Sequence, residues 1–496
     1  MGDVLLSPKF WVWVAITVFV LFAAGPIIGG GKGWQYRLRR ILDRRVFGSA
    51  RWAKPWHLWR AGLTKPGGLF LGNLWGQDFF HNGEGHLLTI GGTGGGKSSG
   101  LVVPTLLTLT EGSVIVTDPS GELAAMTSRR RAEIGPVAFL NPFAASFGKV
   151  AGLTFEDTGF NPFSVLDAKS PDFISNVNAF SRLLMVTDRQ ESGSYWNDEG
   201  AEFLSLMIAS IILYDEADLH NLSFLYSVVR DSAEGLQQRL KHIIRYDHPA
   251  LRDEAERFIS IMDKAAPQWA GIASKAALAT KRYAPTTPLG EHTKKDGLNA
   301  ATLKTEKITV YILIPTAMLP TALPWLNMLV GIFNQAVAQP GPSTPVTMLI
   351  DETPSLGYIP DLISSMALYR KSGLRTWLFT QTYAAMAAPE RYGREGMQTM
   401  MGLTTIKQFF AVEEPEVQEL VSKLCGQKSV SNPSSTGTVG DVGQPLIRPD
   451  QVRGLPKWSQ IIVRGGMDYP IKAKMVPYFK RKDWQEMADP NPYRSR

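Results

Sequence analysis

Two stretches of the chain, residues 86–165 and 305–480, alternate short apolar runs with helical patterns. The apolar runs have the length and β-branched content of buried strands, and strands that alternate with helices predict a parallel sheet covered by helices. The runs are Leu87–Ile90, Val114–Thr117, Val137–Leu140, Ile308–Ile314, Thr347–Ile350, Thr376–Phe379 and Thr405–Phe410. The pattern predicts one α/β domain that is formed by two separate stretches of the sequence.

The region between these parts, residues 172–283, follows a helical period instead. In Tyr195–Tyr214, one stripe of the expected helix carries Phe203, Met207 and Ile211 and ends at Tyr214. Further amphipathic helices are predicted at Asn221–Arg230, Ala233–Arg245, Ala250–Asp263 and Gln268–Arg282. The pattern predicts an all-α domain inserted into the α/β domain.

A third pattern is the continuous apolar run Phe10–Ile28, which has 19 residues and no charge. A helix of that length rises about 28 Å, close to the thickness of the hydrocarbon core. Lys32–Arg45 follows with six basic residues and one acid, so the positive-inside rule places the rest of the chain in the cytoplasm. The alternative is a cleaved signal peptide, whose basic cluster would precede the apolar run. The pattern favours a single-pass membrane anchor, and whether another membrane helix lies upstream stays open.

Composition and charge narrow the functional classes. Cys425 is the single cysteine, which excludes an intrachain disulfide and a four-cysteine metal site. The net charge is +7, but residues 1–90 hold 11 Lys or Arg against 4 Asp or Glu and account for the whole surplus. Net charge is therefore poor evidence for nucleic-acid binding and better evidence for a membrane.

The segment GGTGGGKS at residues 91–98 fits the phosphate-loop pattern GxxxxGK[ST] at every fixed position. Glycines let backbone N–H groups close around phosphate oxygens, while Lys97 would reach the β- and γ-phosphates and Ser98 would ligate Mg²⁺. A flexible glycine-rich turn is the alternative, but an apolar run precedes the segment and a helical stretch follows it. The residues expected to bind ATP are Gly91, Gly92, Thr93, Gly94, Gly95, Gly96, Lys97, Ser98 and Ser99.

A phosphate loop needs an acid at the end of another strand to hold Mg²⁺. The run VTMLIDE ends in Asp351, expected to hold Mg²⁺, and Glu352, expected to polarise the attacking water. The next apolar run ends in Gln381, whose amide could sense the γ-phosphate or position water. An isolated acid pair could simply cap a turn. The order of these elements is that of RecA-like motor ATPases. The chain has no ABC-type LSGGQ sequence, and no guanine-reading [NT]KxD follows the acidic strand.

Several tracts, in this order, resemble the type IV secretion coupling proteins, the TraG-like membrane ATPases of bacterial conjugation. The resemblance covers nearly the whole chain after the apolar N-terminal run. The tracts are FGSARWA at 47–53, the phosphate loop, VIVTDPSGEL at 114–123, FLNPF at 139–143, FNPF at 160–163, LIDETPSLGYIP at 349–360, YRKSGLR at 369–375, FTQT at 379–382 and PLIRPDQVRGLP at 445–456.

The resemblance implies a homohexameric ring with nucleotide bound between subunits. An arginine from the neighbouring subunit would complete each pocket, and Arg370 matches that position; from the residues alone, a solvated helix end would look the same. Ser120 stands where the family usually has lysine, and the effect on hydrolysis stays open. Asp118 could lie near the Mg²⁺ or cap a strand end.

These patterns together predict a RecA-like P-loop NTPase domain with an inserted all-α domain and an N-terminal transmembrane helix. Its expected parts are the anchor and basic segment at 1–45, the first ATPase part at 46–165, the insert at 166–300 and the second ATPase part with the tail at 301–496.

The leading functional hypothesis is an ATPase that recruits a relaxase–DNA complex, with single-stranded DNA, or protein effectors, and moves it into the secretion channel with inner-membrane channel components. An FtsK/HerA-type DNA-pumping motor and a non-hydrolysing docking receptor that binds ATP remain the alternatives.

Overall fold

The computed structural model describes residues 47–147, 153–185, 195–246, 248–341, 344–359, 361–433 and 439–493. The described residues of Met1–Trp52 and Gln418–Val452 form one compact unit, and those of Ala53–Val417 and Arg453–Arg496 form another. The expected transmembrane helix at 10–28 and the basic segment at 32–45 lie outside the described residues.

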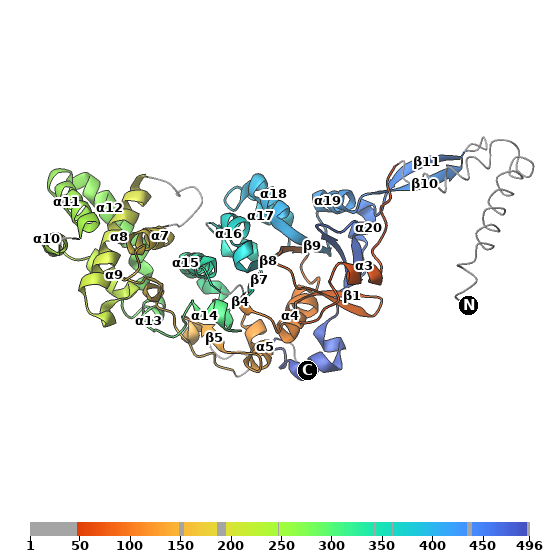
Figure 1. The fold of residues 1–496 in the computed structure, drawn as a ribbon, viewed down its shortest axis with the longest axis horizontal. Helices are drawn as coiled ribbons and strands as arrows, with labels where there is room; N and C mark the ends of the chain where they lie inside the picture. Colours follow the sequence, from red (N-terminus) through yellow and green to blue (C-terminus); the bar gives the residue numbers. More distant parts are fainter. Residues whose placement is uncertain are drawn as a thin grey trace, which may run out of the picture. The chain divides into compact units, whose positions relative to one another are not determined.

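The larger unit contains an eleven-stranded sheet in the order β2-β1-β13-β12-β9-β3-β8-β7-β4-β6-β5 (Figure 1). From β9 to β5 every neighbouring pair is parallel. These strands are β3 (His86–Gly91), β4 (Ser113–Thr117), β5 (Val137–Leu140), β6 (Thr309–Ile312), β7 (Val346–Ile350), β8 (Leu374–Thr380) and β9 (Thr404–Phe410). Each predicted strand is present within a few residues of its expected bounds, which confirms the α/β fold.

Four strands that the sequence did not reveal extend this sheet on one side. They are β1 (Leu69–Leu74), β2 (Gln77–His81), β12 (Ser459–Arg464) and β13 (Ile471–Lys474), and their pairings are antiparallel. The tail of the chain therefore pairs beside the segment that precedes the phosphate loop. No local pattern predicts such pairing, because the partners are far apart in sequence.

Helices cover the sheet, and the helix that follows the glycine-rich loop begins irregularly. A π-helical turn, η1 (Ser98–Val102), leads into α4 (Val103–Thr108), which holds Pro104 near its start. Because proline has no N–H, it fits only where the normal helical hydrogen bond is not needed. The other helices of this part include α5 (Glu122–Ala132), α14 (Thr302–Thr305), α15 (Leu319–Ala338), α16 (Leu362–Leu368), α17 (Tyr383–Ala387), α18 (Gly393–Leu403) and α21 (Lys482–Met487).

Between β5 and β6 the chain forms a group of helices. They are α7 (Phe173–Met185), α8 (Tyr195–Tyr214), α9 (Leu222–Val229), α10 (Ala233–Arg245), α11 (Pro249–Lys264), α12 (Ala266–Thr280) and α13 (Pro288–His292). The predicted stripe of α8 is buried at Phe203, Met207 and Ile211, and Tyr214 is half-buried. Nearly every residue from Ala201 to Ile211 is buried, so α8 is the central helix of this group and not a one-sided amphipathic one.

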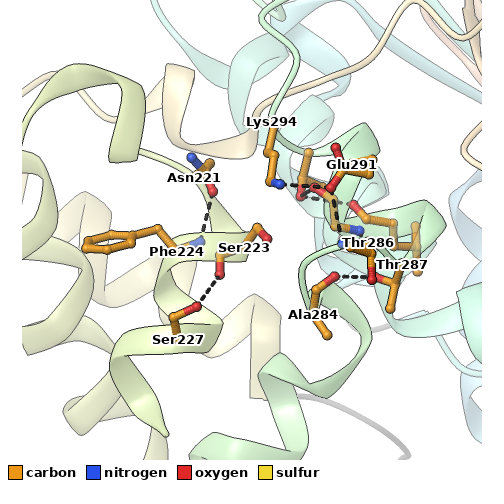
Figure 2. A network of polar contacts seen from close by, with 12 residues as sticks. Asn221, Ser223, Phe224, Ser227, Ala284, Thr286, Thr287, Glu291 and Lys294 are labelled. Atoms are coloured by element: carbon orange, nitrogen blue, oxygen red, sulfur yellow. Dashed lines mark hydrogen bonds and ion pairs between the residues drawn. The ribbon is translucent and has the colours of Figure 1, made fainter. Parts of the chain in front are cut away.

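Side chains cap two of these helices where they start (Figure 2). The Asn221 amide oxygen accepts the Phe224 N–H at 2.9 Å at the start of α9. The hydroxyl of Thr287 caps α13, and Glu291 accepts the Thr286 N–H at 3.2 Å. Such caps satisfy N–H groups that have no partner within the helix and so fix where each helix begins.

Within the described residues, one helical segment, Thr316–Ala338, is long and apolar enough to cross a membrane. Most of it is α15, which contacts α7 of the helical group and β8 of the sheet. Its residues from Trp325 to Asn334 are buried without a break. The apolar composition of α15 therefore matches its place in the protein core.

The smaller unit has a two-stranded antiparallel sheet of β10 (Gln427–Pro433) and β11 (Val439–Pro445). Ser49 forms a bridge with Lys428, and the Phe47 N–H donates to the Ser429 hydroxyl at 3.1 Å. These contacts attach the described start of the chain to the hairpin.

Candidate nucleotide site

The glycine-rich loop leaves β3 at the edge of the sheet where the parallel strands end. Gly94 and Gly96 have φ of +70° and +91°, a region that favours glycine. A side chain at Gly92 would lie 2.2 Å from the Ala411 carbonyl oxygen, and one at Gly96 would lie 2.2 Å from the Trp458 ring. Both the backbone shape and the close neighbours therefore require glycine, and the loop can present its N–H groups to phosphate.

Lys97 reaches the end of β7. Its ammonium lies 2.9 Å from a carboxylate oxygen of Glu352 and 3.7 Å from one of Asp351. It also donates to the Asp351 carbonyl oxygen at 2.6 Å. The side chains of all three residues are about one-fifth exposed, so the group is open enough for exchange with a ligand.

Gln381, at the end of β8, joins the same group. Its amide nitrogen donates to Glu352 at 3.0 Å, and its amide oxygen accepts the Thr93 hydroxyl proton at 2.6 Å. Four side chains, from the phosphate loop and from the ends of β7 and β8, thus form one connected chain of contacts, Thr93–Gln381–Glu352–Lys97. Residues that are up to 288 positions apart meet at this edge.

Asp351 has an unsatisfied carboxylate. Its Oδ1 atom is buried and has no hydrogen-bond partner. Burial raises the pKa of the Asp351 carboxyl, and the nearby Lys97 charge opposes that rise. A bound cation would satisfy this oxygen, and carboxylate and hydroxyl oxygens are the ligands that Mg²⁺ prefers. Ser98 is half-buried and Ser99 is buried in the first turn after the loop, so the residues present fit a phosphate-bound Mg²⁺.

Asp118, which follows β4, is buried beside this group. One carboxylate oxygen accepts the Ala124 N–H of α5 at 2.8 Å, and the other accepts the Ser120 hydroxyl proton at 3.2 Å. Burial, together with the charge of Asp351, raises the pKa of Asp118 to about 7. Asp118 therefore caps the start of α5 and also lies close enough to Asp351 to feel its charge, while its place near the Mg²⁺ stays a prediction. Ser120 takes part in that cap.

Arg370 lies apart from these residues. It opens the short 3-10 helix η7 (Arg370–Ser372), immediately before β8, and its side chain is exposed. Its charge helps lower the pKa of His86, at the start of β3, after the larger effect of burial. The parallel strands place Arg370 at the amino edge of the sheet, opposite Lys97. The structure thus does not bring Arg370 to the nucleotide site of its own subunit.

Two aromatic residues and a hydroxyl at the site were missed by sequence reasoning. The Trp458 ring packs against Gly96 and Gly100, and the Phe410 ring lies where side chains at Gly91 or Gly95 would project. The Thr117 hydroxyl accepts the Asp351 N–H at 3.3 Å. Trp458 and Phe410 are far from the loop in sequence, and no motif marks them.

Comparisons with known proteins agree with this geometry. The family described as type IV secretory system conjugative DNA transfer matches residues 44–495. The chain is 24% identical to Protein VirD4 of Rhizobium radiobacter, covering 97% of this chain and 70% of the relative. It is 26% identical to the type IV secretion system-coupling protein VirD4 of Bartonella quintana, with 87% and 67% covered. A probable conjugal transfer protein TraG of Sinorhizobium fredii is 24% identical, with 93% and 70% covered. The chain thus spans about two thirds of the length of these relatives.

Solved structures show the same fold. The unbound bacterial conjugative coupling protein TrwBdeltaN70 matches with a TM-score of 0.64 at 16% identity, over 86% of this chain and 93% of that one. TrwB in complex with the ATP analogue ADPNP has a TM-score of 0.63 at 17% identity, with 86% and 93% covered. TrwB in complex with ADP and Mg²⁺ also has a TM-score of 0.63 at 17% identity, with 86% and 94% covered. The family match and the fold together confirm the resemblance seen in the sequence: the chain belongs to the type IV secretory system conjugative DNA transfer family.

Proposed function

We propose that the chain is a membrane-anchored ATPase that couples hydrolysis to the movement of a relaxase–DNA complex, or of protein effectors, into a type IV secretion channel. The observation that carries this proposal is the connected group of Thr93, Gln381, Glu352 and Lys97 at the carboxyl edge of the sheet. A phosphate loop, an acid pair and a neutral amide in contact are the parts that ATP hydrolysis needs.

ATP would bind with its phosphates along the loop N–H groups and with Lys97 on the β- and γ-phosphates. Ser98 and the unsatisfied oxygen of Asp351 would hold Mg²⁺, which neutralises charge on the phosphates when it is bound. Lys97 now contacts Glu352 at 2.9 Å. Phosphate oxygens compete for the same ammonium, so nucleotide binding weakens that ion pair.

Release from Lys97 leaves Glu352 as a base with only the Gln381 amide as a partner. Glu352 can then take a proton from the attacking water, while Gln381 holds the carboxylate in position. In this scheme Lys97 keeps Glu352 neutralised until the phosphates arrive. Hydrolysis is thereby coupled to correct nucleotide binding.

Arg370 supports assembly into a ring. Because it is exposed at the edge opposite Lys97, it can act only on the nucleotide of a neighbouring subunit. An arginine supplied in this way stabilises the transition-state charge. We propose a homohexamer in which each pocket combines Lys97 of one subunit with Arg370 of the next.

The proposed location is the inner membrane, with Phe10–Ile28 as a single-pass anchor and the bulk of the chain in the cytoplasm. The support is the uncharged run of 19 residues and the basic cluster that follows it. In this position the ATPase would face inner-membrane components of the secretion channel.

The test is the steady-state ATPase rate of the full chain with and without single-stranded DNA. We expect a DNA-stimulated rate that Lys97→Ala and Glu352→Gln both abolish. Glu395→Gln serves as the matched control, because Glu395 is an exposed carboxylate in the first turn of α18 and has no contact with Lys97, Glu352 or Gln381. Substrate export that persists in both site variants would contradict the motor and would favour a docking receptor that binds ATP without using it.

A further inference from the structure

An acid-free segment precedes the phosphate loop. Residues 44–77 contain six Lys or Arg and no Asp or Glu. The segment includes the helix α3 (Pro55–Arg60), the first helix of the described chain, and strand β1 (Figure 1). The segment also comes soon after the proposed membrane anchor in the sequence. Its charge is therefore unlike that of the rest of the protein, where the two signs balance.

Helix α3 exposes two tryptophans. Trp56 is 52% exposed and Trp59 is 72% exposed. A tryptophan buries more apolar area than most side chains, so two on a single helix of six residues are a costly exposure in water. Contact with an apolar or interfacial environment would offset this unfavourable exposure.

The two tryptophans are exposed although α3 itself is packed against the protein. Leu58, between the two tryptophans, is fully buried. The Ala53 N–H donates to the Pro470 carbonyl at 2.9 Å, and the His57 ring meets the Tyr469 ring edge-on at 4.6 Å. These contacts fix one face of α3 to the larger unit, and so they hold the tryptophans outward.

The charges around the tryptophans are basic and available. The Lys54 ammonium lies 4.7 Å from the centre of the Trp56 ring, and Arg60 is exposed. Neither forms an ion pair within the described part of the chain. Lys65, in the same segment, differs because it pairs with Glu111 at 3.4 Å. The surface of α3 thus combines aromatic rings with unneutralised positive charge.

We propose that α3 binds the anionic headgroup surface of the membrane that holds the anchor, with Trp56 and Trp59 at the interface and Lys54 and Arg60 on lipid phosphates. Tryptophan favours the headgroup region, because its ring is apolar and its N–H is polar. Basic residues next to a membrane segment are attracted to anionic lipids. This inference rests on the membrane attachment in the proposed function.

The contact would give the ATPase a second point of attachment. Helix α3 is held to the larger unit through contacts with Pro470 and Tyr469. Headgroup binding by α3 would therefore set the direction in which the nucleotide-binding unit faces the membrane. The proposed partner is negatively charged lipid, so a membrane of neutral lipid alone would bind α3 poorly.

Single-stranded DNA is another ligand that aromatic and basic side chains bind. Such sites follow a groove along which successive bases stack. Two exposed tryptophans three positions apart on a helix of six residues project from the convex surface of that helix. In the sequence, α3 follows the proposed anchor and its basic cluster, which also favours the lipid surface. Binding to DNA becomes an outcome of the test.

The test uses the full chain in nanodiscs of phosphatidylcholine alone or mixed with phosphatidylglycerol. Hydrogen exchange is followed at the amides of His57, Ala61 and Leu63, which are all hydrogen-bonded to neighbouring carbonyls around α3. We expect roughly threefold slower exchange with phosphatidylglycerol than without it. Trp56→Ser with Trp59→Ser should abolish the difference.

Two further variants protect this test against a folding artefact. Lys54→Glu with Arg60→Glu keeps both tryptophans and should also remove the effect of phosphatidylglycerol. Trp196→Ser is the matched control, since Trp196 is 40% exposed but lies on α8, and it should leave exchange in α3 unchanged.

The outcomes are distinct. A chain that fails to co-elute with nanodiscs contradicts the membrane attachment and this inference together. Co-elution with equal α3 exchange in both lipid mixtures contradicts the inference alone. Slower α3 exchange on adding single-stranded DNA in detergent, with no effect of lipid, would overturn it in favour of a nucleic-acid surface.

Discussion

The two edges of the parallel sheet use buried polar side chains in opposite ways. At the amino edge, the His86 ring lies 2.7 Å from the Met366 carbonyl and accepts the Thr376 N–H at 3.0 Å. Arg375 donates twice to the Thr347 hydroxyl, at 3.1 and 2.9 Å. These groups find their partners among buried backbone and hydroxyl groups, so they fix the packing of one strand on the next.

At the carboxyl edge, the charged side chains contact mainly one another. Lys97 is shared between Asp351 and Glu352, and the Asp351 oxygen that lies 3.7 Å from its ammonium has no hydrogen-bond partner. Incomplete pairing is costly in a folded protein, and it persists where a ligand completes the set. The comparison indicates that the amino edge contributes mainly stability and the carboxyl edge mainly binding.

Arg370 is the exception that tests this comparison most strongly, because it is an exposed functional candidate at the amino edge. Arg370→Ala should lower the ATPase rate of the assembled protein about a thousandfold, as loss of an arginine finger does. Its nucleotide affinity should not change. Mixed assemblies of Arg370→Ala and Lys97→Ala subunits should recover activity, because some pockets then hold both intact residues.

Lys371→Ala is the matched control for this substitution, since Lys371 lies beside Arg370 in the same exposed 3-10 turn. Mixed assemblies that stay inactive would contradict the contribution of Arg370 across subunits. A full ATPase rate in Arg370→Ala would exclude any finger role.

The histidines at the amino edge should make the protein less stable in acid. Burial lowers the pKa of His86 from 6.5 to about 4, and His81 shifts equally. A lowered histidine pKa gives stability that is present above pH 6.5 and is lost as the pH falls toward 4. We expect about 2 to 3 kcal/mol of loss for each histidine across this window.

Urea unfolding followed by tryptophan fluorescence at several pH values measures this loss. His86→Gln should flatten the dependence between pH 6.5 and 4, whereas His242→Gln, at an exposed position of α10, should not. An unchanged slope in His86→Gln would show that the histidine does not carry the effect.

The carboxyl edge should respond to ligand more than to packing. Glu352→Gln removes the carboxylate that holds Lys97 at 2.9 Å, and so frees the ammonium for phosphate. We expect ATP to bind about threefold more tightly, the size of a partly exposed ion pair. Titration with a fluorescent nucleotide measures this affinity, and weaker binding would mean that Glu352 positions Lys97 instead of competing for it.

An effect of the same size but opposite direction is expected for Trp458, whose ring packs against Gly96 and Gly100. Trp458→Leu loosens the loop, so nucleotide should bind about threefold more weakly because less of the site is preorganised. Trp59→Leu, an exposed tryptophan on α3, is the control for the same titration. Equal affinity in Trp458→Leu and the native protein would show that the loop holds its shape without the ring.

Local chemistry made much of the site predictable. The phosphate loop needs glycines with left-handed φ, and Gly94 and Gly96 have it. Apolar runs ending in acids or an amide also revealed β7 and β8, because parallel strands of one sheet end at the same edge. The roles assigned to Asp351, Glu352 and Gln381 remain predictions, but the structure places these side chains with Lys97.

Other features could not be predicted from such patterns. The strands β1, β2, β12 and β13 pair antiparallel across long sequence separations. The central position of α8 depends on helices that surround it on every side. The raised pKa of Asp118 depends on burial and on Asp351, which lies far along the chain.

The sequence by itself determined the loop, the acids and the order of strands and helices, because backbone geometry and side-chain chemistry act over a few residues. Only the tertiary structure decided that Trp458 supports the loop, that Arg370 faces away from Lys97 and that α3 holds two tryptophans outward. These features depend on which distant segments pack together, and packing is a property of the whole fold.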